Sequence, residues 1–183
     1  MVTMSEPEYD IELLISEEDI ATRVNTLALE ITSHYSTSES LVVVGLLNGS
    51  FIFIADLVRR LDLPVEVDFM TVSSYGRSMT SSGDVRIVKD LKGSIEGRNV
   101  LVIEDLVDTG LTLNRVRDIL SARRPKSLEV CCLLSKASRR EVDVPVRWVG
   151  FDIPDEFVVG YGTDYAQRSR NLPYIGKVTV RER

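Results

Sequence analysis

Two adjacent acidic residues near the middle of the chain have the spacing of a ligand-binding pair. Glu104 and Asp105 follow the apolar run Val100–Ile103, which has the pattern of a buried strand. Ligands of parallel α/β sheets bind where the strands end. Neighbouring side chains diverge there, so the two carboxylates can reach different oxygens of one polyol or of a metal-bound ligand.

The turn after these acids has the composition of a phosphate cradle, and it comprises Asp108, Thr109, Gly110, Leu111 and Thr112. A glycine lets a backbone N–H approach an anion closely, and hydroxyls and free N–H groups at a helix start bind phosphate. The motifs GxxxxGK[ST] and GxGxxG are absent from the sequence. The acids and the turn together indicate a site for a phosphorylated sugar. The alternative is a turn that only caps a helix, with solvated acids before it.

Length and charge narrow the class of protein. A chain of 183 residues suits one core, and the net charge of -6 argues against nucleic acid or an anionic membrane as the main partner. Cys131 and Cys132 are adjacent within an apolar run, so we expect two buried thiols on opposite faces of a strand. Free thiols and an acidic N-terminus unlike a signal peptide suggest a cytoplasmic protein. The single histidine, His34, lies near the end of a predicted helix and is not expected to be catalytic.

Apolar strands and amphipathic helices alternate along the chain. We expect strands at about 41–44, 65–72, 85–88, 100–103, 128–134, 146–151, 157–161 and 178–180. Helices are expected from Ser16, from Phe51 to Leu61 with Phe51 facing inward, and from about Thr112 to Ala122. This order predicts an α/β fold with a parallel sheet covered on both faces.

The segment from Glu104 to Gly110, with the sequence EDLVDTG, resembles the signature with which type I phosphoribosyltransferases bind phosphoribosyl pyrophosphate (PRPP). The resemblance extends along nearly the whole chain to the bacterial 6-oxopurine members of the hypoxanthine type. The segments that carry it are 46–51, 67–70, 73–76 and 153–161.

The resemblance implies one domain over residues 1–183, with a central, mostly parallel twisted sheet flanked by helices. The core would span about 35–150, and a small hood would be built from about 1–15 and 151–183. It implies purine salvage in which PRPP and hypoxanthine or guanine give IMP or GMP and pyrophosphate. The reaction would need Mg²⁺ and pass through an oxocarbenium-like transition state.

The family pattern also assigns roles to individual residues. Glu104 and Asp105 would hold the ribose hydroxyls and a metal ion, and Asp108 would act as general base within the 5′-phosphate loop of residues 108–112. The purine-side set is Lys136, Phe157, Val158 and Asp164, with Lys136 donating to the 6-oxo oxygen and Asp164 binding a second Mg²⁺. The pyrophosphate set is Asn48, Gly49, Ser50 and Arg170, and the mobile loop contains Ser74 and Tyr75.

One position departs from the family pattern. Asn48 stands where the family normally has Arg or Lys, so a positive charge near pyrophosphate is lost. A cis peptide bond between Leu47 and Asn48 is also implied by the resemblance, and the family forms homodimers and homotetramers.

The alternative hypothesis is a PRPP- or nucleotide-sensing regulatory protein on the same fold. Such a protein should carry a basic face. We interpret the pairs Arg59-Arg60, Arg123-Arg124 and Arg139-Arg140 as ordinary solvated charge, so no nucleic-acid partner is expected.

Overall fold

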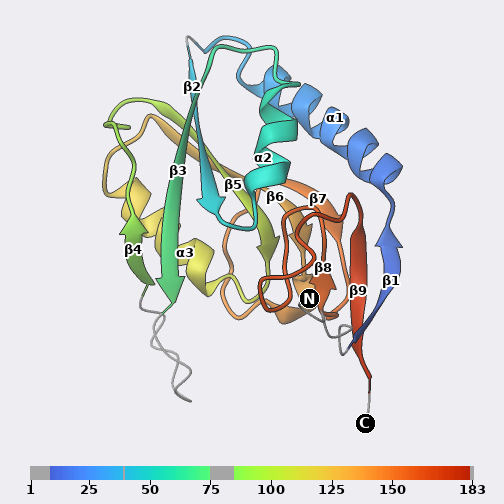
Figure 1. The fold of residues 1–183 in the computed structure, drawn as a ribbon. Helices are drawn as coiled ribbons and strands as arrows, with labels where there is room; N and C mark the ends of the chain where they lie inside the picture. The colour runs from blue at the N-terminus through green and yellow to red at the C-terminus, as the bar shows by residue number, and fades with distance from the viewer. Residues whose placement is uncertain (1–8, 39, 75–84, 182–183) are drawn as a thin grey trace, which may run out of the picture.

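A six-stranded sheet forms the centre of the protein (Figure 1). The computed structural model describes residues 9–38, 40–74 and 85–181. The strand order is β4-β3-β2-β5-β6-β7, and only β4 runs antiparallel to its neighbour. The bounds are β2 Leu41–Leu47, β3 Val65–Ser74, β4 Val85–Lys89, β5 Asn99–Val107, β6 Ser127–Ser135 and β7 Trp148–Asp152. The predicted α/β class with a mostly parallel sheet is confirmed.

Helices cover both faces of this sheet. Helices α1 (Glu17–His34) and α2 (Phe51–Val58) share one apolar cluster with Val43, Leu101 and Cys131. Helix α3 (Leu111–Ser121) packs on the opposite face in a second cluster that contains Cys132. The two cysteines therefore lie on opposite faces and are buried, as predicted.

The register of α2 differs from the prediction. The helix buries Phe53, Ile54 and Leu57, whereas Phe51 is 43% exposed. All eight residues except Ala55 and Asp56 are large and apolar, so helical spacing alone did not single out the inward face. Phe51 begins the helix directly after a turn, and the geometry of this turn directs its ring outward.

Both ends of the chain contribute to a second, three-stranded antiparallel sheet. Its order is β1 (Tyr9–Ile15), β9 (Ile175–Val180) and β8 (Val158–Val159). Strand β1 was not predicted, although apolar and acidic residues alternate from Tyr9 to Leu13; the alternation is short, and the register shifts between Leu13 and Ile15. In Figure 1, β1 and β9 lie side by side at one edge of the molecule. No helix in the described part of the chain has the length and apolarity needed to cross a membrane.

Arg23 protects the exposed edge of the central sheet. Strand β7 is an edge strand, and its free carbonyl groups would otherwise lack partners. Arg23 Nε donates to Gly150 O at 3.0 Å, and a terminal nitrogen donates to Val149 O at 2.7 Å. A third contact joins the guanidinium to Glu30 at 3.1 Å, so one side chain ties α1 to β7.

Replacing Arg23 with Ala should lower the free energy of unfolding by about 1.5–3 kcal/mol, because two charge-assisted hydrogen bonds are lost. Urea denaturation followed by circular dichroism measures this change. Arg115→Ala is the matched control, since Arg115 is exposed on α3, and its effect should stay within about 0.5 kcal/mol. Equal losses in the two variants would contradict this role of Arg23.

Candidate active site

Strand β5 carries the two predicted acids beyond the point where its pairing with β2 stops. The pairing of β2 with β5 stops at Ile103, whereas the pairing with β6 continues to Val107. Glu104 and Asp105 therefore belong to the last part of the strand, flanked by β6 on one side and by the turn after β2 on the other. The prediction placed them just after the strand.

The Glu104 side chain is held close to Asp105. The backbone N–H of Asp105 donates to Glu104 Oε1 at 3.3 Å. Burial, together with the neighbouring Asp105 carboxylate, raises the pKa of Glu104. Within the described residues, neither carboxylate has a Lys or Arg partner in an ion pair. The pair is an accumulation of negative charge that a cation would relieve.

These two acids fit a Mg²⁺ ion that is shared with a phosphorylated substrate. Carboxylate oxygens are the hard ligands that Mg²⁺ prefers, and Mg²⁺ in such sites typically takes one or two carboxylates and completes its shell with phosphate oxygens and water. In the described part of the chain, no three His, Cys, Asp or Glu side chains come together as a metal cage. Substrate oxygens would have to supply the remaining ligands.

The turn after β2 packs directly on Asp105. A Cβ atom at Gly49 would collide with the Asp105 carboxylate, so only glycine fits there. The peptide bond between Leu47 and Asn48 is cis, as the resemblance implied. Ser50 is fully buried, and its hydroxyl donates to Leu46 O at 2.5 Å, so this residue can offer only its backbone to a ligand. The Asn48 side chain is exposed.

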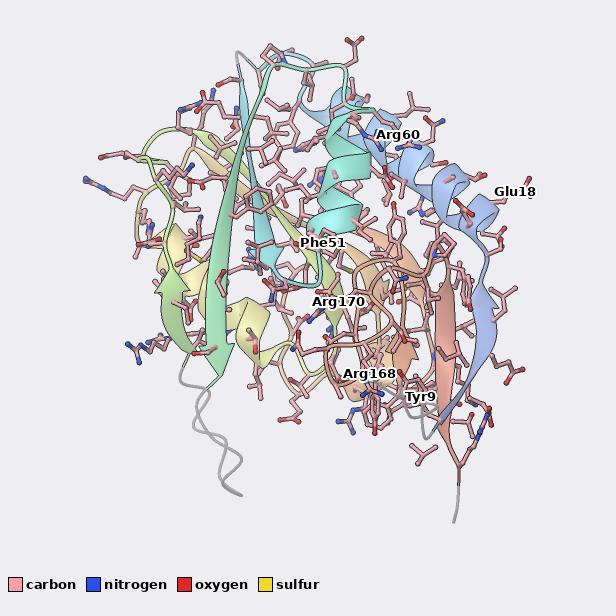
Figure 2. The ribbon with its side chains drawn as sticks, in the orientation of Figure 1. Tyr9, Glu18, Phe51, Arg60, Arg168 and Arg170 are labelled. Carbon is pink, nitrogen blue, oxygen red and sulfur yellow. The ribbon has the colours of Figure 1, made fainter. Side chains whose placement is uncertain are left out.

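Asp164 and Arg170 meet on the far side of this turn. Their side chains form an ion pair of 2.7 Å, and Arg170 also donates to Gly162 O at 2.8 Å. Gly162 packs in turn on the Gly49 carbonyl, where a Cβ atom would not fit. Figure 2 shows Arg170 next to the start of α2 at Phe51. Arg170 and Gly49, two members of the predicted pyrophosphate set, are thus brought together.

Three of the four predicted purine-side residues, Lys136, Phe157 and Val158, also lie close together, whereas the fourth, Asp164, pairs with Arg170. Lys136 follows β6, is only 6% exposed, and its Nζ lies 5.8 Å from the centre of the Phe157 ring. The Phe157 ring is 72% exposed, so one face is open to a ligand. Val178 N donates to Phe157 O, so the backbone groups of the next residue, Val158, point away from β9. This free edge suits contact with the edge of a base.

The loop from Asp108 to Thr112 joins β5 to α3. Gly110 has a φ of +85° and is enclosed by Val142 and Val144, so a side chain there would be strained and crowded. Asn114 N donates to Gly110 O, which begins the helix and leaves the preceding N–H groups facing the loop. The loop has the donors for a phosphate group, as predicted.

Two arginines to which the sequence analysis gave no role in the site bind this loop. Arg139 Nε donates to Asp108 Oδ1 at 3.2 Å, and Arg140 donates to Asp108 O at 2.9 Å. The interpretation of this pair as solvated charge is therefore wrong. Its position three and four residues after Lys136 was the only available signal, because the contacts to Asp108 span 31 and 32 residues.

Part of the predicted mobile loop lies outside the described residues. Ser74 is the last residue of β3, and Tyr75 is not described.

The comparisons with known proteins agree with this geometry. Residues 14–166 match the family model described as the phosphoribosyl transferase domain. The chain belongs to the phosphoribosyltransferase family. A hypoxanthine phosphoribosyltransferase of Haemophilus influenzae is 60% identical over 177 residues, which cover 96% of this chain and 99% of the relative. The enzyme of that name from Escherichia coli K12 is 57% identical over 174 residues, 94% and 98% of the two chains.

Solved structures of phosphoribosyltransferases share the fold. A crystal structure of a hypoxanthine-guanine phosphoribosyltransferase from Bacillus anthracis superposes with a TM-score of 0.89 and 46% identity. The match covers 93% of this chain and 100% of that one.

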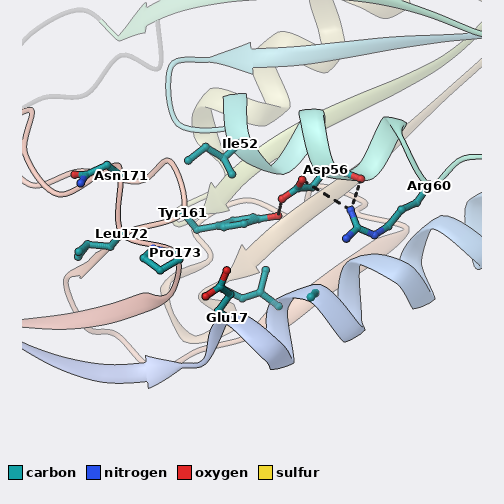
Figure 3. Close-up of a pocket in the computed structure, with 10 residues that line it drawn as sticks. Glu17, Ile52, Asp56, Arg60, Tyr161, Asn171, Leu172 and Pro173 are labelled. Carbon is teal, nitrogen blue, oxygen red and sulfur yellow. Dashed lines mark hydrogen bonds and ion pairs between the residues drawn. The ribbon is translucent and has the colours of Figure 1, made fainter.

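A separate cavity lies beside helix α2 of this phosphoribosyltransferase. It has a volume of about 420 Å³ and lies among the start of α1, helix α2 and residues 171–173 (Figure 3). Tyr161 crosses it and donates to Asp56 at 2.6 Å, while Arg60 donates to the backbone oxygen of Asp56 at 2.7 Å. Burial and the Asp56 carboxylate raise the pKa of Tyr161. This hydrogen bond ties the Gly162 segment to α2 and so supports the Gly49 turn.

Replacing Glu104 with Gln should stabilise the ligand-free protein near neutral pH. The substitution removes a carboxylate whose negative charge is disfavoured by burial and by Asp105, as the raised pKa of Glu104 indicates. We expect an increase in melting temperature of about 2–4 °C. The unfolded-state pKa is about 4.3 and the folded-state pKa is higher. The wild-type protein therefore loses stability as the pH rises from the unfolded-state pKa through the folded-state pKa of Glu104. The increase in melting temperature of the variant over wild type should shrink as the pH falls towards about 4.

Thermal melts across this pH range, with Glu141→Gln as an exposed control, test the prediction. A gain that does not depend on pH would contradict the electrostatic explanation.

Proposed function

We propose that this phosphoribosyltransferase transfers the 5-phosphoribosyl group of PRPP to N9 of hypoxanthine or guanine, which yields IMP or GMP and pyrophosphate in purine salvage. The observation that carries the proposal is that Lys136 and Phe157 lie beside the loop that begins at Asp108. One end of the site thus offers a cation and an aromatic face to a base, and the other offers acids and a phosphate loop. The names of the relatives support the same reaction.

The sugar and phosphate of PRPP would bind at the end of β5. Glu104 and Asp105 would hold the ribose hydroxyls, and the N–H groups of residues 108–112 would bind the 5′-phosphate. When bound at the two acids, Mg²⁺ would supply positive charge to the departing pyrophosphate. Gly49 and Ser50 would offer backbone donors to this group, and Arg170 would add a planar cation after leaving Asp164.

The base would lie between Phe157 and the sugar. Lys136 would donate to the 6-oxo oxygen, and because a lysine has no acceptor, the amino group of adenine would be disfavoured. Val158 would contact the base edge through its backbone. Asp108 would accept the proton that the purine ring loses as the bond to the ribose forms. Asp164 could bind a second Mg²⁺ only by giving up Arg170.

The regulatory alternative receives no support from the relatives, which are named as enzymes. We also propose assembly into a homodimer or homotetramer, to which the exposed Phe51 and Val67 could contribute apolar surface. A cytoplasmic location is proposed because Cys131 and Cys132 are free thiols.

Steady-state kinetics with PRPP and Mg²⁺ test the proposed activity directly. Hypoxanthine or guanine should be converted with a kcat/KM roughly 10⁴-fold above that of adenine, because adenine leaves Lys136 without an acceptor. Xanthine should be converted with a kcat/KM between these two values. Equal conversion of adenine, or no conversion of any base, would refute the assignment.

Asp108→Asn should slow turnover by about two to four orders of magnitude, the contribution typical of a general base. Binding of IMP, followed by calorimetry, should change little because the loop backbone is retained. Asp118→Asn on the exposed face of α3 is the control. Unchanged turnover of Asp108→Asn would remove this residue from the mechanism.

A further inference from the structure

Four charged side chains of alternating sign connect the two ends of the proposed purine site. Lys136 Nζ lies 3.5 Å from Asp155 Oδ1. The same oxygen lies 3.7 Å from Arg139 Nε, and this nitrogen donates to Asp108 Oδ1 at 3.2 Å. The order is therefore Lys136, Asp155, Arg139, Asp108.

The last contact of this chain conflicts with the role proposed for Asp108. The guanidinium holds Asp108 Oδ1, and its positive charge competes with the proton that Asp108 would accept from the purine. The hydrogen bond with Asp108 raises the pKa of Arg139, so this side chain stays charged and remains a competitor. The arrangement in the structure is a resting one, and Arg139 must leave before the transfer can occur.

The chain itself offers Arg139 a second acceptor. Asp155 already shares Nε of Arg139 with Asp108, so a small rotation is enough to exchange the partners. The side chains of Arg139, Asp108 and Asp155 are 47%, 42% and 53% exposed, and ion pairs between such groups are weak and easily exchanged. Lys136 is the fixed end, since its side chain is only 7% exposed.

The surrounding backbone is held while these side chains are free to exchange. Arg140 donates to Asp108 O at 2.9 Å and to Ser135 Oγ at 3.1 Å, and Glu141 N donates to Thr109 O at 3.0 Å. On the other side, Glu156, next to Asp155, pairs with Lys177 of β9 at 2.6 Å. An exchange of partners therefore requires no movement of the loops.

We propose that Arg139 is a positioning residue that blocks Asp108 in the free enzyme and moves to Asp155 when a 6-oxopurine engages Lys136. This inference rests on the proposed function. The carbonyl oxygen of the base replaces Asp155 as the acceptor for Lys136, and Asp155, left with Arg139 as its only cationic partner of the two, attracts Arg139 more strongly. Recognition of the 6-oxo group at one end of the purine thereby frees the general base at the other. A base without this oxygen is held poorly and also leaves Asp108 blocked.

Three variants test the exchange: Asp155→Asn, Arg139→Gln and the double variant. In Asp155→Asn the second acceptor loses its negative charge, so Arg139 stays with the charged Asp108, and kcat for hypoxanthine should fall about tenfold while KM for PRPP stays unchanged. Arg139→Gln alone should remain within about threefold of wild type. The double variant should recover to a similar level, because no cation blocks Asp108.

Asp143→Asn, an exposed acid in the following loop, is the control for Asp155→Asn, and Arg115→Gln is the control for Arg139→Gln. Melting temperatures identify any variant that fails to fold, and Asp155→Ser then replaces Asp155→Asn. Recovery in the double variant supports the exchange, since a merely structural role of Asp155 would not be relieved by a second substitution.

A double variant that is as slow as Asp155→Asn, or slower, would overturn the exchange. Absence of activity in the wild type with hypoxanthine would instead refute the proposed function, so the two failures are distinguishable.

Discussion

The parallel pairing of β5 with β6, which continues after the pairing of β5 with β2 has stopped, is the constraint on which the site depends. It carries Glu104 and Asp105 past the last pair between β2 and β5, where the Gly49 turn packs against Asp105. It also starts the phosphate loop beside Lys136, whose backbone N–H donates to Val107 O at 3.0 Å. Sugar, phosphate and base would therefore be positioned from the ends of two neighbouring strands.

In the described part of the chain, acidic side chains, some with and some without cationic partners, are concentrated at this end of strands β5 and β6. Glu104 and Asp105 are adjacent acids without a cationic partner among the described residues, whereas Asp108, Asp155 and Asp164 each have an arginine or lysine. The protein thus keeps one pair of carboxylates for an external cation and neutralises the others internally. In the proposed reaction, a substrate would have to compete with Arg139 and to separate Arg170 from Asp164, which would link binding to rearrangement of charged side chains.

Sequence reasoning predicted the parts of the fold that depend on local pattern. The strand before Glu104, helix α3 to within one residue and the opposite faces of Cys131 and Cys132 follow from periodicity and turn chemistry. The resemblance supplied the residues that now lie together, including Lys136 with Phe157. The resemblance was less informative about features that depend on contacts between residues far apart in the sequence.

The features that the sequence analysis did not predict have physical causes. Strand β1 alternates over only five residues, from Tyr9 to Leu13, and is defined by its pairing with β9, far along the chain. The outward direction of Phe51 depends on the turn before α2. The contacts of Arg139 and Arg140 depend on the fold bringing β5 and β6 together, and neither residue stands out by type or spacing.

The pairing of β1 with β9 has a consequence for synthesis of the protein. Asp10 contacts Arg181, 171 residues later, so β1 leaves the ribosome long before its partner exists. The neighbouring strands of the central sheet are closer in sequence. The central sheet can therefore assemble before β1 has a partner strand. The layer that carries Val158 and supports Phe157 can therefore be completed only after β9 has been synthesised.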